Sequence, residues 1–171
     1  AQYRAHVARM LKLVDAANAD EQAGWIVDLE TQLAKASLDR VALREPLNNY
    51  HMVSMRDADT ATPHFPWSAM FKELGRGDVT RFSLSQPKFF AAADKALATA
   101  PIAHWQAYLR WHLVDGAAPA LSKAFVDESF DFRGRTLRGM KELKPRWKRA
   151  IDATNGALGF AVGEAYVQRT F

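Results

Sequence analysis

Apolar residues recur at intervals of three and four positions through most of this chain, and prolines divide the recurrences into segments. This spacing places apolar side chains on one face of a helix, whereas a half-buried strand needs alternation at every second residue. Proline interrupts a helix from within but is well tolerated in its first turn. The pattern therefore predicts an all-α fold made of several amphipathic helices.

The same signals give approximate helix boundaries. We expect one helix over residues 3–18, a second over 20–37 and an added turn over 38–43 before Pro46. Further helices are predicted over 67–74 and after Pro87, Pro101, Pro119 and Pro145, the last continuing almost to Phe171.

Two of these helices carry long apolar faces, and we expect Trp147 on the second to belong to the core. After Pro119, we expect Leu121, Phe125 and Phe130 to pack inward. Gly156, Gly159 and Gly163 recur on the last helix, and this spacing predicts close packing against another helix. The apolar faces consist of Ile102, Trp105, Leu109 and Leu113 after Pro101, and of Trp147, Ile151, Leu158, Val162 and Tyr166 after Pro145.

Residues 79–84 depart from the helical pattern, because their alternation predicts a short strand. No complementary segment is apparent, so we expect a partner outside this sequence. A length of 171 residues with 49% hydrophobic residues predicts a single domain over 1–171. No apolar run approaches the about 18 residues of a membrane span. The start at Ala1, soon followed by helical sequence, suggests a piece of a longer protein.

Few residues have the spacing that catalysis or metal binding requires. The absence of cysteine excludes disulfides, thiolate metal sites and a cysteine nucleophile. None of the five histidines has a histidine partner four positions away, the spacing of many zinc sites. His104 and His112 lie about 12 Å apart along a helix, so we expect ordinary half-buried or surface roles. A site assembled from His6, His51 and His64 is the alternative.

Other local patterns are also interpreted as structural. Residues 75–77 lack the preceding strand and following helix of a phosphate-binding loop, and no G-x-S-x-G segment marks a serine nucleophile. We therefore predict no catalytic, cofactor-binding or metal-binding residue in this chain. We expect four acids to be solvated charges, namely Asp94, Asp115, Asp127 and Glu128.

The segment 133–149 holds eight Lys or Arg residues and one acid, Glu142. Removing these from the chain's 23 cations and 19 acids leaves 15 and 18, a net charge of −3, so the positive charge is local. Three interpretations are open: a solvated or interdomain surface, recognition of acidic peptides, or nucleic-acid binding in which Arg135, Arg138 and Lys141 would take part.

The last third of the chain also carries a longer pattern: Arg146-Trp147-Lys148-Arg149, Asn155-Gly156, Ala161-Val162-Gly163, Tyr166-Val167 and Phe171. It resembles R-W-x-x, N-G and A-V-G-x-x-Y-V-x-x-x-F of the neprilysin family of zinc metalloendopeptidases. Upstream, similar segments include Pro87 to Phe90, Trp105 with Leu109 and Trp111, and Leu121-Ser122 with Phe125, Phe130, Leu137 and Gly139.

The resemblance extends from about Tyr3 onward and has two departures. Residues 50–52 read Tyr-His-Met where relatives have Tyr-Asn and then Met one position later. Ala150 stands where animal members carry cysteine, so the chain resembles a bacterial member.

The resemblance implies a parent protein with two lobes. One is catalytic and bears H-E-x-x-H, a downstream glutamate ligand and an N-A-(Tyr/Phe) strand, and the other is mostly helical and caps the cleft. Residues 1–171 match only a central stretch of the helical lobe and contain none of the catalytic motifs. The implied partners are the catalytic lobe of the same polypeptide and peptide substrates, and zinc is the parent's cofactor.

The expected function is therefore that of a capping-lobe fragment that helps to enclose the peptide-binding cleft and is inactive by itself. In the family, the segment before R-W connects two lobe helices, which favours a solvated or interlobe role for the cations of 133–149. The alternative is a free-standing helical module that uses this segment to bind nucleic acid or another anionic partner. The family implies a periplasmic or secreted location, with the cytoplasm as the alternative.

Overall fold

The computed structural model describes residues 1–171 and contains eight α-helices, which confirms the all-α prediction. Short 3₁₀ turns η1 (Ala42–Arg44), η2 (Pro46–Asn49) and η3 (Ala118–Ala120) connect them, and a π-helical segment, η4 (Phe130–Thr136), follows α7. The α-helices are α1 (Gln2–Lys12), α2 (Ala19–Ala36), α3 (Met55–Ala61), α4 (Trp67–Glu73), α5 (Pro87–Thr99), α6 (Ile102–Ala117), α7 (Lys123–Ser129) and α8 (Arg146–Thr170).

The helix boundaries agree with the local sequence signals at most positions. Helices α5, α6 and α8 begin at or directly after Pro87, Pro101 and Pro145, as predicted. The first helix ends at Lys12 instead of Asn18, because Asp15 and Asn18 have positive φ and turn the chain into α2. No helix contains an apolar stretch of the length that spans a bilayer.

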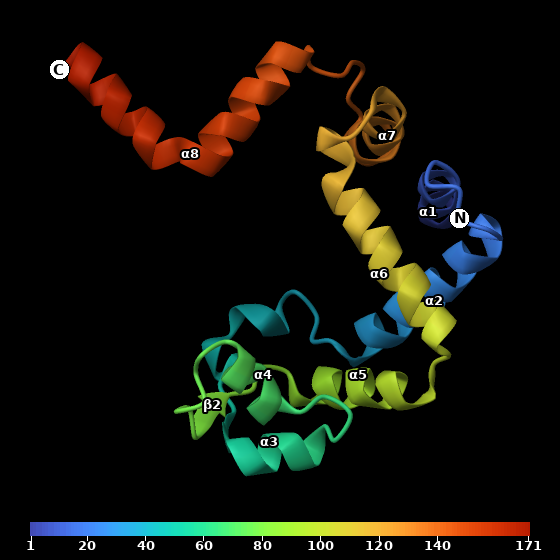
Figure 1. Cartoon of the computed structure of the whole chain (residues 1–171), viewed down its shortest axis with the longest axis vertical. Coiled ribbons are helices and arrows are strands. Elements are labelled where there is room, and N and C mark those ends of the chain that lie inside the picture. The colour runs from blue at the N-terminus through green and yellow to red at the C-terminus, as the bar shows by residue number, and fades with distance from the viewer.

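The main core forms where α1 and α2 pack against α6. Trp111 lies at its centre and is 1% exposed, and the residues around it come from all three helices. Figure 1 shows α6 running from α5 at one end to α7 at the other, past α1 and α2. The buried residues of this core are Val7, Ala8, Met10, Leu11, Ala19, Ala23, Ile26, Ala107, Trp111 and Ala118.

A second, smaller core forms around Trp67, next to a two-stranded antiparallel sheet. Strand β1 (Met52–Ser54) pairs with β2 (Arg81–Ser83), and Val53 lies opposite Phe82. The prediction that the strand within 79–84 needs a partner outside the chain is therefore wrong. Strand β1 has only three residues and leads directly into α3, whose first turn is capped by the hydroxyl of Ser54, so it shows no alternation in the sequence.

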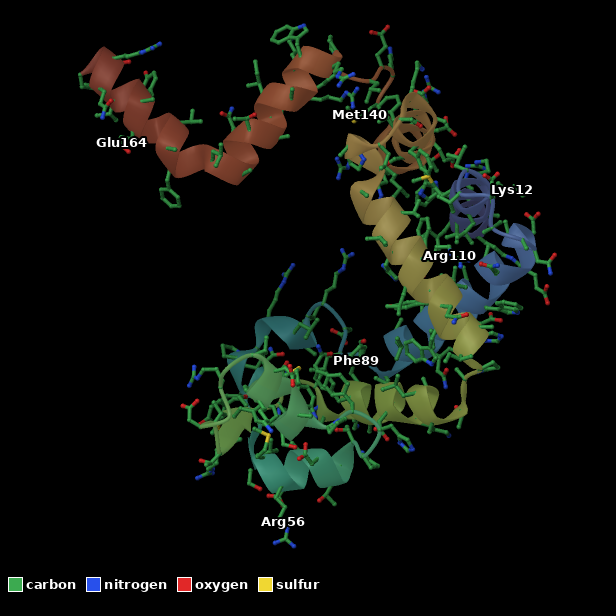
Figure 2. The ribbon with its side chains drawn as sticks, in the orientation of Figure 1. Lys12, Arg56, Phe89, Arg110, Met140 and Glu164 are labelled. Carbon is green, nitrogen blue, oxygen red and sulfur yellow. The ribbon has the colours of Figure 1, made fainter.

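Helix α8 extends away from the rest of the chain and has no buried residue. It bends at Leu158, where φ is −122° and ψ is 26°. Figure 1 shows the two arms as a V, and Figure 2 shows their side chains, including Glu164, without a neighbouring element. A Cβ added at Gly156, Gly159 or Gly163 would meet no atom, so the predicted helix packing at these glycines is absent within this chain.

The predicted apolar faces of α6 and α8 are likewise not buried in this chain. Leu113 is 74% exposed and Trp147 is 61% exposed, whereas α6 buries the opposite side through Ala107, Trp111 and Val114. The expectation that Trp147 belongs to the core is therefore wrong within this chain, whereas Phe125 packs against the main core as expected. Helix α6 is apolar on more than one side, so its sequence does not specify which side α1 and α2 cover.

The π-helical segment depends on a glycine. A Cβ at Gly134 would lie 2.4 Å from the ring of Phe130, whereas one at Gly116, in α6, would meet nothing. We expect Gly134→Ala to displace the ring and lower the free energy of unfolding by about 1–3 kcal/mol. The matched change Gly116→Ala is expected to raise it by about 0.5–1 kcal/mol, since alanine favours an exposed helix. Thermal denaturation of both variants measures the difference, and equal effects would contradict the steric argument.

Candidate functional site

His6 is fully buried on α1 between residues that are distant in sequence. Its ring stacks on Phe132 with centroids 4.4 Å apart and meets Trp111 edge-on at 5.4 Å. Atom Nδ1 lies 2.8 Å from Oε1 of Glu128, within hydrogen-bond distance. Atom Nε2 lies 3.7 Å from Oδ1 of Asp115, which is too long for a hydrogen bond. The contacts fasten α1 to α6, α7 and η4.

An arginine binds each of the two carboxylates beside His6. Arg9 donates from Nε to both oxygens of Glu128, at 2.9 and 2.8 Å, and Arg133 donates to Asp115. Burial acts to raise the pKa of Asp115, but the neighbouring His6 ring and the Arg133 guanidinium outweigh it and hold the pKa below its ordinary value. No signal in the sequence announces this cluster, because His6 and Glu128 are 122 positions apart.

A second histidine and acid pair joins the connection after α3 to α5. Asp94 is 8% exposed and accepts a hydrogen bond from the backbone N–H of His64 at 2.7 Å, while Nδ1 of that histidine lies 3.0 Å from its other oxygen. The prediction that Asp94, Asp115 and Glu128 are solvated is therefore wrong, since each partners a group from a distant segment. Asp127 is exposed, as predicted.

The histidines are not brought together into a site. His6 has its partners on α6 and α7, His64 pairs with an acid of α5, and His51 is exposed beside the sheet. No three His, Asp or Glu side chains are grouped so that they could hold a metal ion. The arrangement does not support the alternative of a histidine site.

The remaining histidines have surface roles, as expected. His104 stacks on Trp25 with centroids 4.4 Å apart, and its ring is half-buried. His112 is exposed, and its Nε2 atom lies 3.2 Å from a carboxylate oxygen of Glu30. Both rings cover the surface of α2.

The glycine segment 75–77 ends a helix. Gly75 has a φ of +71°, and the backbone N–H of Arg76 donates to the carbonyl of Phe71 at 2.8 Å. This geometry satisfies carbonyl groups at the end of α4. The segment therefore follows a helix and leads toward β2, without the preceding strand and following helix that a phosphate-binding loop has.

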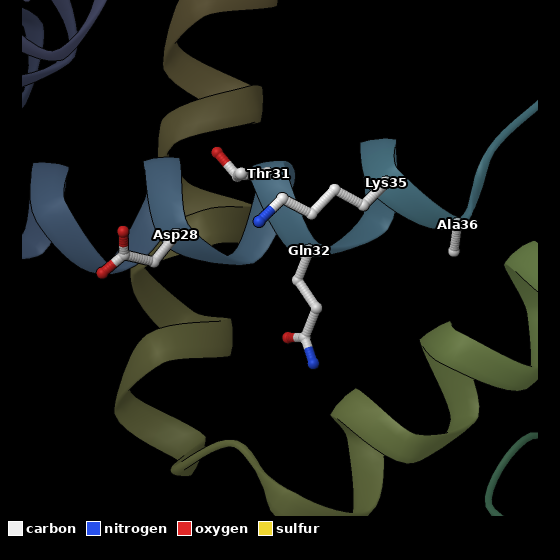
Figure 3. Close-up of a pocket in the computed structure, with 5 residues that line it drawn as sticks. All are labelled: Asp28, Thr31, Gln32, Lys35 and Ala36. Atoms are coloured by element: carbon white, nitrogen blue, oxygen red, sulfur yellow. The ribbon is translucent and has the colours of Figure 1, made fainter. Parts of the chain in front are cut away.

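A depression of about 460 Å³ lies on the surface of α2. Figure 3 shows its lining side chains, which all project from this one helix. They include one acid, Asp28, and one base, Lys35, and no pair that would activate a nucleophile. The chemistry is that of a solvated helix surface. The other residues of the lining are Thr31, Gln32 and Ala36.

The basic segment 133–149 is partly neutralised by acids of the same chain. Arg135 pairs with Asp131 at 3.2 Å and Lys144 with Asp152 at 2.8 Å, in addition to the pair formed by Arg133. Seven of the eight cations are exposed and Arg149 is half-buried, and four of the eight line an open cavity of about 260 Å³. These four cations are Arg133, Arg138, Lys144 and Arg149.

The fold matches part of the solved structures of a zinc metalloprotease. The structure of zinc metalloprotease Zmp1 of Mycobacterium tuberculosis in complex with an inhibitor superposes with a TM-score of 0.90 and 34% sequence identity. The superposition covers 99% of this chain and 26% of that chain. The open state of the same enzyme gives a TM-score of 0.89, with 99% and 27% covered.

Sequence comparison identifies the family. The sequence model of Peptidase family M13 matches residues 1–171, and the chain belongs to this family. Endothelin-converting enzyme 1 of Rattus norvegicus is 24% identical over 176 residues, which covers 99% of this chain and 23% of the relative. Membrane metallo-endopeptidase-like 1 of Homo sapiens is 24% identical over 168 residues, with 92% and 21% covered.

The resemblance to the neprilysin family is therefore confirmed over the whole chain. The chain spans between a fifth and a quarter of the length of the sequence relatives described above. None of the comparisons supports the nucleic-acid alternative.

Proposed function

We propose that residues 1–171 form part of the helical capping lobe of a zinc-dependent peptidase and supply one wall of its peptide-binding cleft. The observation that carries the proposal is the match to Peptidase family M13 along the whole chain, together with the fold shared with zinc metalloprotease Zmp1. Residues 1–171 contain no H-E-x-x-H, so the zinc ligands and general base would belong to another part of the polypeptide.

The exposed apolar faces support the proposal that further protein covers this chain. Leu109 and Leu113 are exposed on α6, and Phe160, on α8, is fully exposed. Leu109 and Leu113 lie one turn apart on α6, and large exposed apolar surface marks an interaction site in soluble proteins. The three exposed glycines of α8 would let a neighbouring backbone approach closely.

The role that follows is selection of substrates by access. A wall of packed helices beside a zinc centre would admit flexible peptides and exclude folded proteins, while the zinc polarises the scissile carbonyl and activates water. One solved structure of Zmp1 is described as an open state, and opening and closing of lobes would admit peptide and release product in this protein too. We extend the proposal to a location outside the cytoplasm.

The full natural polypeptide is expected to cleave a quenched fluorescent peptide, because it would unite the helical lobe with the zinc-bearing lobe. Activity should disappear with a chelator and return with added zinc, and a folded protein substrate should resist cleavage. Peptide fluorescence and zinc content measure these properties. Residues 1–171 prepared alone are expected to show neither stoichiometric zinc nor cleavage. Zinc-dependent cleavage by this shorter chain would contradict the proposal.

A further inference from the structure

The cavity on the basic segment lies where five parts of the chain meet. Its walls come from η3, α7, the π-helix η4, the connection 137–145 and the first turns of α8. In Figure 2, Met140 marks the connection between η4 and α8. We propose that this cavity is a carboxylate-binding site that takes an acidic side chain or a C-terminal carboxylate of a peptide segment.

The charge of the cavity is unbalanced. Of its four cations, Arg133 and Lys144 each pair with a carboxylate. Arg138 and Arg149 have no carboxylate partner. No acidic residue is among the cavity's lining residues. Converging cations without a counter-charge repel each other, and a bound anion relieves this repulsion.

One of the two unpaired arginines is held in place by the backbone. The guanidinium of Arg149 is tied by its Nε to the carbonyl oxygen of Lys144 at 3.2 Å, which leaves its terminal nitrogens free to donate. Gly139 has a φ of +67°, and this turn lets the N–H of Met140 donate to the carbonyl oxygen of Gly134 at 3.0 Å. The connection therefore folds back onto η4 and brings Arg138 toward the same cavity. π-Helical segments are frequent at functional sites.

The lining selects the chemical class of ligand. An arginine fork matches the two oxygens of a carboxylate, and two free arginines provide two such forks. The lining also includes the apolar side chains of Val126, Phe130 and Met140, which suit the hydrocarbon part of a peptide side chain. A volume of about 260 Å³ accommodates one or two side chains. A nucleic-acid backbone instead needs cations spread along a strip.

The carboxylate has two possible sources, a free peptide and an acidic segment of the same polypeptide outside residues 1–171. Neither source requires zinc, so the inference is independent of the proposed peptidase activity. Binding is therefore measured with the full natural polypeptide in the presence of a chelator, which prevents cleavage of the probe. The probe is a fluorescein-labelled hexapeptide of alternating leucine and glutamate, and glutamine replaces glutamate in its control.

The variant Arg138→Ala/Arg149→Ala is expected to weaken binding of the glutamate peptide at least tenfold, because it removes both unpaired guanidinium groups. Arg138→Lys/Arg149→Lys should retain part of the affinity through its charge. Arg40→Ala/Arg110→Ala is the matched control, since both arginines are exposed and lack a carboxylate partner, and it should bind like the parent protein. Fluorescence anisotropy measures all four affinities, and the glutamine peptide should bind at least tenfold more weakly than the glutamate peptide.

A second measurement tests whether an acidic segment of the same polypeptide fills the cavity. If a segment of the same polypeptide fills the cavity, the free probe will not bind, and Arg138→Ala/Arg149→Ala will lower the melting temperature by several degrees relative to Arg40→Ala/Arg110→Ala. The difference should shrink at about 1 M salt, where exposed charges are screened. Equal binding of the probe to the parent and to Arg138→Ala/Arg149→Ala overturns the proposal. The absence of both probe binding and a salt-dependent difference in melting temperature overturns it as well.

Discussion

Replacing Trp111 by alanine is expected to lower the free energy of unfolding by about 3–5 kcal/mol, the range for removal of a large aromatic side chain from a packed core. The side chain is almost fully buried and belongs to the cluster that joins α1, α2 and α6. The surrounding helices cannot collapse into the space without losing their own contacts. Chemical denaturation followed by circular dichroism measures the loss.

A hydrogen-bond chain adds to the cost at Trp111. Its Nε1 donates to the hydroxyl of Tyr3 at 3.2 Å, and that hydroxyl donates to Glu30 at 2.9 Å. Burial raises the pKa of Tyr3, and its hydrogen bond to Glu30 raises it further, so the phenol keeps its proton at physiological pH. Removing the indole leaves the hydroxyl of Tyr3 without its donor.

Two control variants separate these contributions. Trp111→Phe keeps an aromatic ring but removes the indole N–H, and we expect it to cost about 1–3 kcal/mol. Leu47→Ala changes a highly exposed apolar residue and should stay within about 0.5 kcal/mol of the parent. A loss at Trp111→Ala no larger than that at Leu47→Ala would contradict the position of Trp111 at the centre of the core.

Features of the fold that depend on local physics could be predicted from the sequence. Pro87, Pro101 and Pro145 marked the starts of helices correctly, because proline fixes φ at a value suited to a first turn and lacks the N–H that the first turn leaves unpaired. The pairing of β1 with β2 could not be predicted, since the paired residues are about 30 positions apart and each strand has three residues. Such pairing depends on packing around Trp67 and not on local alternation.

The burial of an apolar face could be predicted only in part. Apolar residues at helical spacing show that one face of a helix is suited to burial. They do not show whether the same chain buries that face. Trp111 is buried against α1 and α2, whereas Leu113 on the same helix and Trp147 on α8 are exposed. The two sequence relatives described above are four to five times longer than this chain, and under the proposed function such faces would meet other parts of a longer polypeptide.

The candidate sites could likewise be predicted from the sequence only in part. The density of cations in 133–149 was visible in the sequence, but the cavity that they line depends on Gly134, Gly139 and the return of the connection onto η4. The environment of His6 was not visible, because its partners come from α6, α7 and η4. Only the assembled fold places two carboxylates beside that ring.

Asp115→Asn is expected to lower the free energy of unfolding at neutral pH by about 1–3 kcal/mol, since it removes a charged partner from Arg133 beside the buried His6 ring. The arginine is half-exposed, so solvent screens its share of this value.

The pH dependence of the stability difference tests whether the Asp115 carboxylate stabilises the fold. Asp115 has a pKa below its ordinary value in the folded state, so its contribution is fully present above the unfolded-state pKa of about 4 and is lost as the pH falls through the lower folded-state pKa. The difference in stability between the parent and Asp115→Asn should therefore be constant near neutral pH and shrink below about pH 4. Asp127→Asn, at an exposed acid of α7, should show little difference at any pH. Denaturation of the three proteins from neutral to acidic pH measures these differences. If the stability difference between the parent and Asp115→Asn persists or widens in acid, the Asp115 carboxylate is not stabilised in the fold.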